Sequence, residues 1–202
     1  MKLIIITRPT FFVEEDKILS ILFDEGLDNL HLKKPDTLPL YSERLLSLLP
    51  EHSARHTTVH DHYYLKNEYG LAGIHLDDEH APIPEGYRGK VSRTCTSTAA
   101  IKDARKSAEY VFLQTDYSLL RRSDRYGEEL VNTLRTARKQ GIIDKKVYAC
   151  GGISLEIIPT LKSIGFGGIV VGEDLWNKFD IHGEQDFKPI LEHFKKLNKA
   201  IK

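Results

Sequence analysis

The chain has 202 residues, and its 29 lysines and arginines balance its 29 aspartates and glutamates, so the formal net charge is zero. This balance argues against a nucleic-acid-binding protein, which usually carries a basic excess. Two cysteines are too few for a disulfide framework, and no run of about 18 apolar residues exists that could span a membrane. We therefore expect a single domain over residues 1–202, in the cytoplasm, with no nucleic-acid or membrane partner; a homo-oligomer is left open.

Short apolar segments alternate with amphipathic segments through the first half of the chain. Apolar or β-branched runs predict strands over residues 3–7, 28–33, 57–60 and 71–76. Apolar residues at helical spacing predict a helix that follows an acidic first turn and stops at Gly26, a second helix that Pro50 ends, and a short helical segment up to Gly70. Residues 77–89 are predicted to form a loop, because prolines and glycines interrupt the pattern there.

The same alternation continues through the second half of the chain. Strands are predicted over residues 90–94, 110–114, 146–150 and 168–171, and helices over 98–108, from 126 to Gly141 and over 155–164. A last helix near 184–199 is predicted to dock on the rest of the chain. Eight strands, mostly separated by helices, indicate an α/β fold, a small single-domain (β/α)8 TIM barrel. A doubly wound open sheet is the alternative, but no G-x-G-x-x-G follows the first strand.

Polar and charged residues crowd the carboxyl ends of almost all these strands, where the active sites of such barrels lie. These ends include His31-Leu32-Lys33-Lys34, His60-Asp61-His62, His75-Leu76-Asp77-Asp78 and Arg93-Thr94-Cys95. Side chains on a barrel strand alternate between the interior and the helix layer, so one of the two lysines is expected at the mouth, and we favour Lys33. Lys34 is kept as a second candidate for binding substrate.

Three aspartates at neighbouring strand ends offer hard oxygen ligands. Asp61, Asp77 and Asp78 suit Mg²⁺, which takes a few carboxylates together with phosphate oxygens of a substrate. Because two histidines flank Asp61, His60-x-His62 is an alternative indication of a zinc site, although no third ligand follows at a diagnostic spacing. Another interpretation places His60 or His75 inside the barrel as a hydrogen-bonded structural residue.

Glycines follow the last two predicted strands. Gly151 and Gly152 after the seventh strand, and Gly172 after the eighth, allow the backbone to approach a ligand and to aim N–H groups at a phosphate. The alternative is that these glycines only form tight turns, and the acidic pair after Gly172 would repel a phosphate unless it faces away or caps a helix. Cys95 is included as a candidate for substrate binding, whereas packing is the favoured role for both Cys95 and Cys150.

In this order, the strand ends resemble the thiamine phosphate synthase and thiazole tautomerase family, whose members are small (β/α)8 barrels. The family motifs Q-L-R-x-K, N-D-R, G-V-H-L-G-Q-x-D, A-x-G-G-I and G-A-x-G-V-A-V-V-S are similar to residues 31–35, 60–62, 73–80, 149–153 and 165–172 of this chain. The resemblance covers most of the chain. The chain departs from the family at Lys33, which replaces an arginine, and at the two histidines that flank Asp61.

The resemblance implies a transferase that joins a hydroxymethylpyrimidine pyrophosphate to a thiazole phosphate and releases pyrophosphate, with Mg²⁺ as cofactor. By position, Asp61 would be a metal ligand, Lys33 would contact the pyrophosphate, and the three glycines would hold the thiazole phosphate. The alternative is a thiazole tautomerase or another isomerase of phosphorylated metabolites, in which His31 or His60 would act as acid and base near working pH. A third hypothesis is a barrel that binds a phosphorylated metabolite without turnover.

Overall fold

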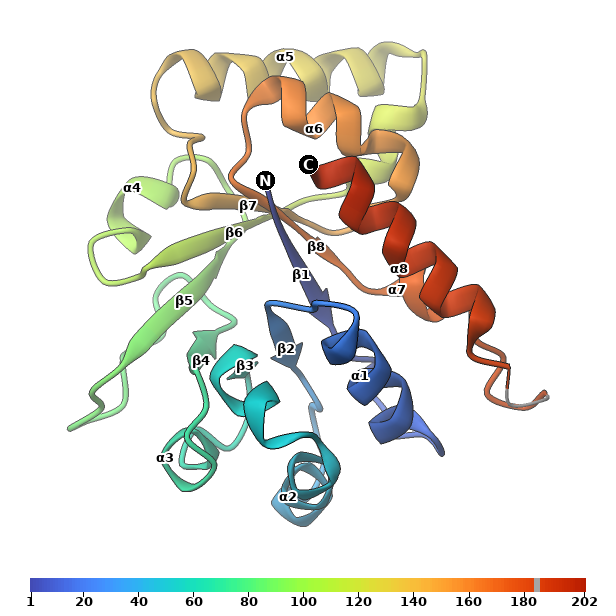
Figure 1. The fold of residues 1–202 in the computed structure, drawn as a ribbon. Helices are drawn as coiled ribbons and strands as arrows, with labels where there is room; N and C mark the ends of the chain where they lie inside the picture. Colours follow the sequence, from blue (N-terminus) through green and yellow to red (C-terminus); the bar gives the residue numbers. More distant parts are fainter. Residues whose placement is uncertain (184–185) are drawn as a thin grey trace.

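The computed structural model describes residues 1–183 and 186–202. Within these ranges, eight parallel strands form a closed barrel in chain order (Figure 1). They are β1 (Lys2–Ile6), β2 (Leu30–Leu32), β3 (Thr57–Val59), β4 (Gly73–Leu76), β5 (Lys90–Cys95), β6 (Tyr110–Gln114), β7 (Val147–Cys150) and β8 (Gly168–Val171). The barrel closes where β8 pairs with β1, with Gly168 opposite Lys2 and Val171 opposite Ile5. The predicted TIM barrel is confirmed, and this closing pair excludes the open sheet.

Helices surround the barrel, with α5 and α6 on the opposite side from α2 and α3 (Figure 1). The α-helices are α1 (Glu15–Asp24), α2 (Pro39–Leu48), α3 (Leu65–Glu68), α4 (Ile101–Ala104), α5 (Arg125–Lys139), α6 (Ile158–Ile164), α7 (Glu173–Trp176) and α8 (Lys188–Ile201), and the 3₁₀ segments are η1 (Glu51–His56), η2 (Tyr117–Arg121) and η3 (Leu155–Ile157). Residues 77–89 are all described and contain no helix, as predicted. None of the described helices is long and apolar enough to cross a membrane.

The helices differ from the sequence-based expectation in two respects. The helix expected over residues 98–108 shortens to α4, because i→i−3 bonds from Lys106 to Asp103 and from Ser107 to Ala104 close the segment before β6. In addition, η1 and η2 have no counterpart among the predicted elements, whereas α7 begins at the acidic pair after Gly172, where a helix start is one of the sequence-based interpretations. η1 and η2 are short segments of six and five residues, and so small a unit shows no apolar periodicity that a sequence pattern could reveal.

Strand alternation divides the apolar side chains into two layers. The outer layer lies between the strands and the helices and includes residues from every strand, such as Ile5, Leu32 and Val171. The inner layer is small and consists of Ile4, Phe112, Tyr148 and Val170 inside the barrel. The rest of the interior, toward β2 to β5, is filled by buried polar side chains, namely His31, His60, His75, Ser92 and Thr94. Because the interior of such barrels is usually dominated by branched apolar residues, this polar half is distinctive.

Helix α8 packs against β1, α1, α6 and α7. Its buried face consists of His193 and the apolar residues Ile190, Phe194 and Leu197, which recur at helical spacing. The ammonium of Met1 donates to the Ile201 carbonyl over 3.3 Å, so the helix ends beside the start of β1. The sequence predicts this helix near 184–199; in the structure it begins at Lys188, and residues 184 and 185 lie outside the described residues.

Candidate active site at the barrel mouth

A cavity of about 480 Å³ opens at the carboxyl ends of β1, β7 and β8. This volume is within the range of small-molecule sites. Its lining comprises Ile6, Arg121, Cys150, Gly151, Gly152, Ile153, Ser154, Val170, Gly172, Glu173, Asp174 and Asn177. The structure therefore brings together the three glycines that the sequence singled out, although they come from two different strand ends.

Close backbone contacts explain two of these glycines without a ligand. Gly151 has a φ of +107°, and a Cβ there would lie 2.3 Å from the Thr115 carbonyl oxygen. Gly152 has a φ of +63°, and a Cβ there would lie 2.9 Å from the Ser118 amide nitrogen. A side chain at Gly151 would clash with the backbone just before η2, and one at Gly152 would clash with the backbone of its first turn. The tight-turn interpretation is therefore sufficient for both residues, and ligand binding is an additional role that we propose below.

Some polar groups around this cavity already have hydrogen-bond partners within the protein, and others do not. Asp174 Oδ2 accepts hydrogen bonds from the Leu155 amide at 3.2 Å and from His193 Nε2 at 2.7 Å, so this carboxylate caps η3 rather than its own helix. The buried Oγ of Ser154 has no hydrogen-bond partner among the described residues. Arg121, at the end of η2, is exposed and lines the cavity. An unsatisfied hydroxyl and an exposed guanidinium are suitable donors for an anion.

On the other side of the mouth, five side chains form a continuous hydrogen-bonded chain. Tyr110 Oη lies 2.8 Å from His31 Nε2, and His31 Nδ1 lies 2.8 Å from His60 Nε2. His60 Nδ1 lies 2.9 Å from Asp77 Oδ1, which also accepts from Lys33 Nζ at 2.9 Å. The chain leads from the barrel interior to the mouth, where the side chains of Lys33 and Asp77 are 36% and 41% exposed.

Burial controls the protonation of this network. Desolvation lowers the pKa of His31 and of His75 well below the usual value, and the neighbouring His60 acts in the same direction. Desolvation also lowers the pKa of His60, although its bond to Asp77 opposes the shift. Burial opposes ionisation of Asp77, but the hydrogen bonds from His60 and Lys33 hold its pKa below the usual value. The imidazoles are therefore neutral and Asp77 is ionised at neutral pH.

Strand alternation separates the two lysines that follow β2. Lys33 reaches the mouth, as expected from the sequence, and pairs there with Asp77. Lys34 does not reach the mouth: it is buried beneath the segment between β1 and α1, where it pairs with Glu15 over 2.6 Å and donates to the Thr10 carbonyl over 3.0 Å. The prediction that Lys34 contacts substrate is therefore corrected, because its ammonium is already enclosed by protein acceptors.

The predicted carboxylate ligands occupy different settings. Asp61 Oδ2 accepts from the Lys34 amide at 2.9 Å, and Asp78 Oδ1 accepts from the His80 amide at 2.6 Å, which closes the turn after β4. Among the described residues, the three predicted carboxylates, Asp61, Asp77 and Asp78, do not by themselves form a close group of metal ligands. Asp61 and Asp77 at adjacent strand ends still suit Mg²⁺, because this ion is commonly held by one or two carboxylates plus substrate phosphates.

Two other sequence expectations are changed by the side-chain directions. Cys95 is fully buried in the outer layer between the barrel and the helices, so it does not reach the mouth and cannot contact substrate there. Burial raises the pKa of its thiol to about 11. His62 Nε2 bonds to the Thr37 carbonyl at 3.0 Å, whereas His60 points into the barrel, so the two histidines do not form a zinc site.

Several residues of this region were missed by sequence reasoning. Ser154 and Asn177 line the cavity, and Tyr110 closes the inner end of the hydrogen-bonded chain. Tyr110 precedes Phe112 by two residues on β6, so period-two alternation alone would have placed both in the interior. Arg121 was not missed, because the sequence places it together with Arg122 after the sixth strand, as a candidate for positive charge. It is positioned by η2, whose N-terminal Asp116 accepts from the Ser118 amide.

No family model and no curated protein matches the chain. Among solved structures, it is similar to a thiamine phosphate pyrophosphorylase from Bacteroides thetaiotaomicron, with 48% identity over 99% of this chain and 97% of that chain and a TM-score of 0.88. A thiamine phosphate pyrophosphorylase from Pyrococcus furiosus has 18% identity, with 100% and 97% of the two chains covered and a TM-score of 0.71. A 3-hexulose-6-phosphate synthase has 16% identity over 100% of both chains and a TM-score of 0.63. The last two show a shared fold.

Proposed function

Because the chain belongs to the thiamine phosphate pyrophosphorylase family, we propose that it joins a hydroxymethylpyrimidine pyrophosphate to a thiazole phosphate and releases pyrophosphate. The observation that carries this proposal is the division of the mouth into two parts. One part is a cavity lined by glycines and anion donors. The other presents Lys33 paired with Asp77, and Asp61 lies at the adjacent strand end, where it accepts from the Lys34 amide. Two phosphorylated substrates need two such parts.

The cavity at β7 and β8 is proposed to hold the thiazole phosphate. Gly151, Gly152 and Gly172 keep its floor free of side chains, and Ser154 offers a buried hydroxyl without a partner among the described residues. Arg121 supplies positive charge at the rim. The carboxylate of Asp174 is occupied by Leu155 and His193, and this engagement reduces its repulsion of an anion.

The opposite part of the mouth is proposed to hold the pyrophosphate. Asp61 and Asp77 would hold Mg²⁺, whose positive charge supports departure of the leaving group. Lys33 would contact a pyrophosphate oxygen with its ammonium. Lys33 and Asp77 pair through Nζ and Oδ1 at 2.9 Å, so Oδ2 of Asp77 and the other N–H groups of Lys33 lie outside this contact and can meet their proposed ligands while the pair persists. Lysine offers a single point charge where the resembled family has an arginine, so Lys33 contributes charge but no bidentate contact.

A thiamine phosphate formation assay tests this proposal directly. The wild-type protein is incubated with both phosphorylated substrates, with Mg²⁺ and with a chelator instead of Mg²⁺. We expect product only with the metal, and a loss of at least tenfold in Lys33→Ala, because one charge-assisted contact is worth roughly 1.5–3 kcal/mol. Lys102→Ala, at an exposed lysine of α4, is the matched control. Absence of product from protein that binds both substrates would refute the assignment.

A proton-moving isomerase acting on a thiazole phosphate is the second candidate. The observation that favours it is the chain from Tyr110 through His31 and His60 to Asp77, which offers a route for a proton to the mouth. His31 has no exposed surface, so it would act through His60 and Asp77 and not by contact with substrate. Metal-independent exchange of deuterium into the thiazole phosphate, without thiamine phosphate formation, would favour this candidate. Thiazole phosphate binding without either reaction would favour the non-catalytic barrel.

A further inference from the structure

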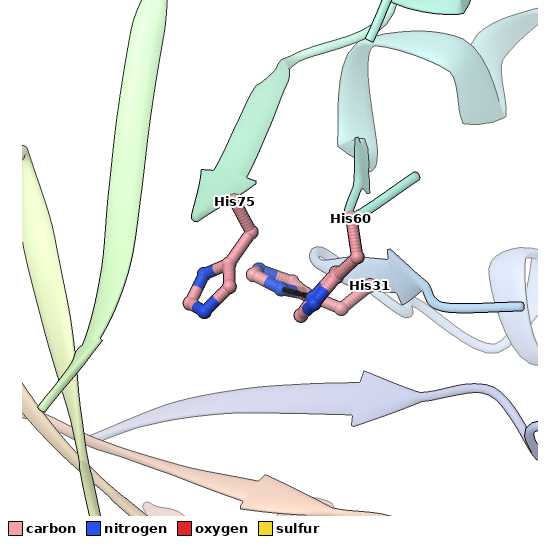
Figure 2. Close-up of side chains that lie close together, drawn as sticks. All are labelled: His31, His60 and His75. Carbon is pink, nitrogen blue, oxygen red and sulfur yellow. Dashed lines mark hydrogen bonds between the residues drawn. The ribbon is translucent and has the colours of Figure 1, made fainter. Parts of the chain in front are cut away.

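Three histidines meet inside the barrel. His31 extends from β2, His75 from β4, and His60 follows β3, and Figure 2 shows the three rings side by side in one space. One ring nitrogen from each lies within 4.8 Å of the others, and all three residues are buried. The synthase proposal gives no role to this cluster. Three polar rings in a barrel interior are also poor substitutes for the branched apolar residues that usually fill it.

The hydrogen bonds fix which ring nitrogens carry protons. The ionised carboxylate of Asp77 only accepts, so His60 Nδ1 carries a proton and donates to it. Neutral His60 therefore presents a bare Nε2, to which His31 Nδ1 donates over 2.8 Å. Tyr110 in turn donates to His31 Nε2. A single proton thus lies between two nitrogen atoms that face each other in the barrel.

We propose that His31, His60 and His75 form a binding site for a divalent transition metal ion of the zinc class, in the place of that shared proton. Neutral imidazole is the form of histidine that ligates such ions, and it suits zinc, nickel, cobalt and copper better than it suits Mg²⁺. All three rings are buried, and burial favours the neutral form of an imidazole. The site is distinct from the two carboxylates proposed for Mg²⁺.

Outer hydrogen bonds are already arranged as in known metal centres, where a ligating histidine bonds through its other nitrogen to a carboxylate or another oxygen. Asp77 orients His60 from the mouth, and Tyr110 orients His31 from inside. On metal binding, the His31 proton moves from Nδ1 to Nε2 and bonds to Tyr110 Oη. The tyrosine hydrogen turns to a neighbouring oxygen such as that of Ser92, so the histidines lose no proton to solvent.

His75 is the ligand that must adjust. Its ring stacks on His60 at 4.2 Å with an interplanar angle of 24°, and its nitrogens bond to Ser92 and Thr94 at 2.8 Å each. Tetrahedral zinc with bonds of 2.0–2.1 Å separates its ligand nitrogens by about 3.3 Å. Binding therefore opens the His31–His60 contact slightly and turns the His75 ring toward them. The hydroxyls of Ser92 and Thr94 can donate or accept, so either nitrogen of His75 can be released.

Metal titration of the intact, metal-stripped protein tests the site. Zn²⁺ binding is measured by calorimetry in excess Mg²⁺, and Co²⁺ is used as a probe because its visible spectrum reports nitrogen ligation and coordination number. We expect one Zn²⁺ per chain, a higher Tm with Zn²⁺, and no such shift with Mg²⁺. Absence of binding, or binding without a shift of the Co²⁺ spectrum away from that of the aqueous ion, would overturn the proposal.

Variants distinguish the buried site from surface histidines. His31→Gln is expected to weaken Zn²⁺ binding by about 100-fold, and Tyr110→Phe, which keeps all three ligands, by about tenfold through loss of the outer bond. His80→Gln is the control, because His80 is exposed. Equal affinity in wild type, His31→Gln and Tyr110→Phe would place the ion elsewhere and refute the assignment. Should His31→Gln fail to fold, Tyr110→Phe alone decides the outcome.

Discussion

The buried ion pair between Lys34 and Glu15 offers a sharp test of how the mouth is built. The Lys34 ammonium lies 2.6 and 2.8 Å from the two carboxylate oxygens of Glu15, 3.0 Å from the Thr10 carbonyl and 4.3 Å from the centre of the Phe11 ring. The two side chains are 0% and 2% exposed. The Lys34 ammonium therefore fastens the start of α1, through Glu15, and the segment before it, through Thr10, onto the chain that follows β2.

Lys34→Met removes the ammonium and leaves a carboxylate buried without its countercharge. Loss of one partner of such a pair costs about 3–5 kcal/mol of folding free energy. Part of this cost depends on pH. Burial raises the pKa of Glu15 to about 7 even with Lys34 present, and loss of the ammonium, which lowers that pKa, raises it further. At pH 5 the folded variant therefore holds Glu15 as a neutral acid. At pH 8 the Glu15 carboxyl must either ionise while buried or take up a proton from a solution in which protons are scarce, and both cost free energy.

The sign follows from proton linkage. Between the unfolded pKa near 4.5 and the raised folded pKa, the folded state binds more protons than the unfolded state, so this group's contribution to stability falls as pH rises. Urea unfolding of wild type and Lys34→Met at pH 5 and pH 8 measures the effect. We expect Lys34→Met to lower the free energy of unfolding by at least about 1 kcal/mol more at pH 8 than at pH 5. This difference is smaller than the effect of a shift of one pKa unit in the folded state.

A second variant and a control complete the test. Lys34→Met combined with Glu15→Gln removes both charges and should recover most of the lost stability at pH 8, because neither charge is left unpaired. Lys102→Met, at an exposed lysine, should change stability by less than about 0.5 kcal/mol. A cost below about 1 kcal/mol for Lys34→Met at pH 8, or equal costs at both pH values, would refute the reasoning.

The remaining predictions concern the mouth and the thiols. Gly151→Ala should destabilise the fold by about 1–3 kcal/mol in thermal unfolding, more than Gly86→Ala, whose Cβ meets open space; equal costs would contradict the close contact with Thr115. Lys33→Ala should weaken pyrophosphate binding more than thiazole phosphate binding in calorimetry, and Asp61→Asn should weaken Mg²⁺-dependent pyrophosphate binding about tenfold; an unchanged affinity would remove either residue from the site. Because burial raises the pKa of Cys95 and Cys150 to about 11 and 12, iodoacetamide should alkylate the folded protein at pH 8 far more slowly than the unfolded protein, and equal rates would disprove the shifts.

Much of the fold follows from local patterns in the sequence. Runs such as residues 3–7 and 168–171 are apolar, short and bounded by polar or glycine residues, so they predict buried strands without tertiary information. Alternation then predicts side-chain direction. It correctly placed Lys33 at the mouth, and it would have assigned Cys95 to the outer layer with Val91 had it been applied along β5.

The site itself depends on contacts between distant segments, which no local pattern encodes. Lys34 is buried because Glu15, on α1, supplies its countercharge, and Asp174 caps η3 instead of α7 because Leu155 lies within reach. The three histidines occur at three separate strand ends in the sequence. Only the parallel register of β2, β3 and β4 reveals that their rings share one space.

The double use of Asp174 links the outer helix layer to the ligand cavity. A single oxygen, Oδ2, holds the first amide of η3 and also His193 of α8, so the cavity wall is braced from behind by a helix that contributes nothing to its lining. Such a brace limits the conformational entropy that the wall can lose when a ligand binds. Substitutions on α8 would therefore appear as weaker binding with a larger entropic penalty in calorimetry, even where every residue that touches the ligand is intact.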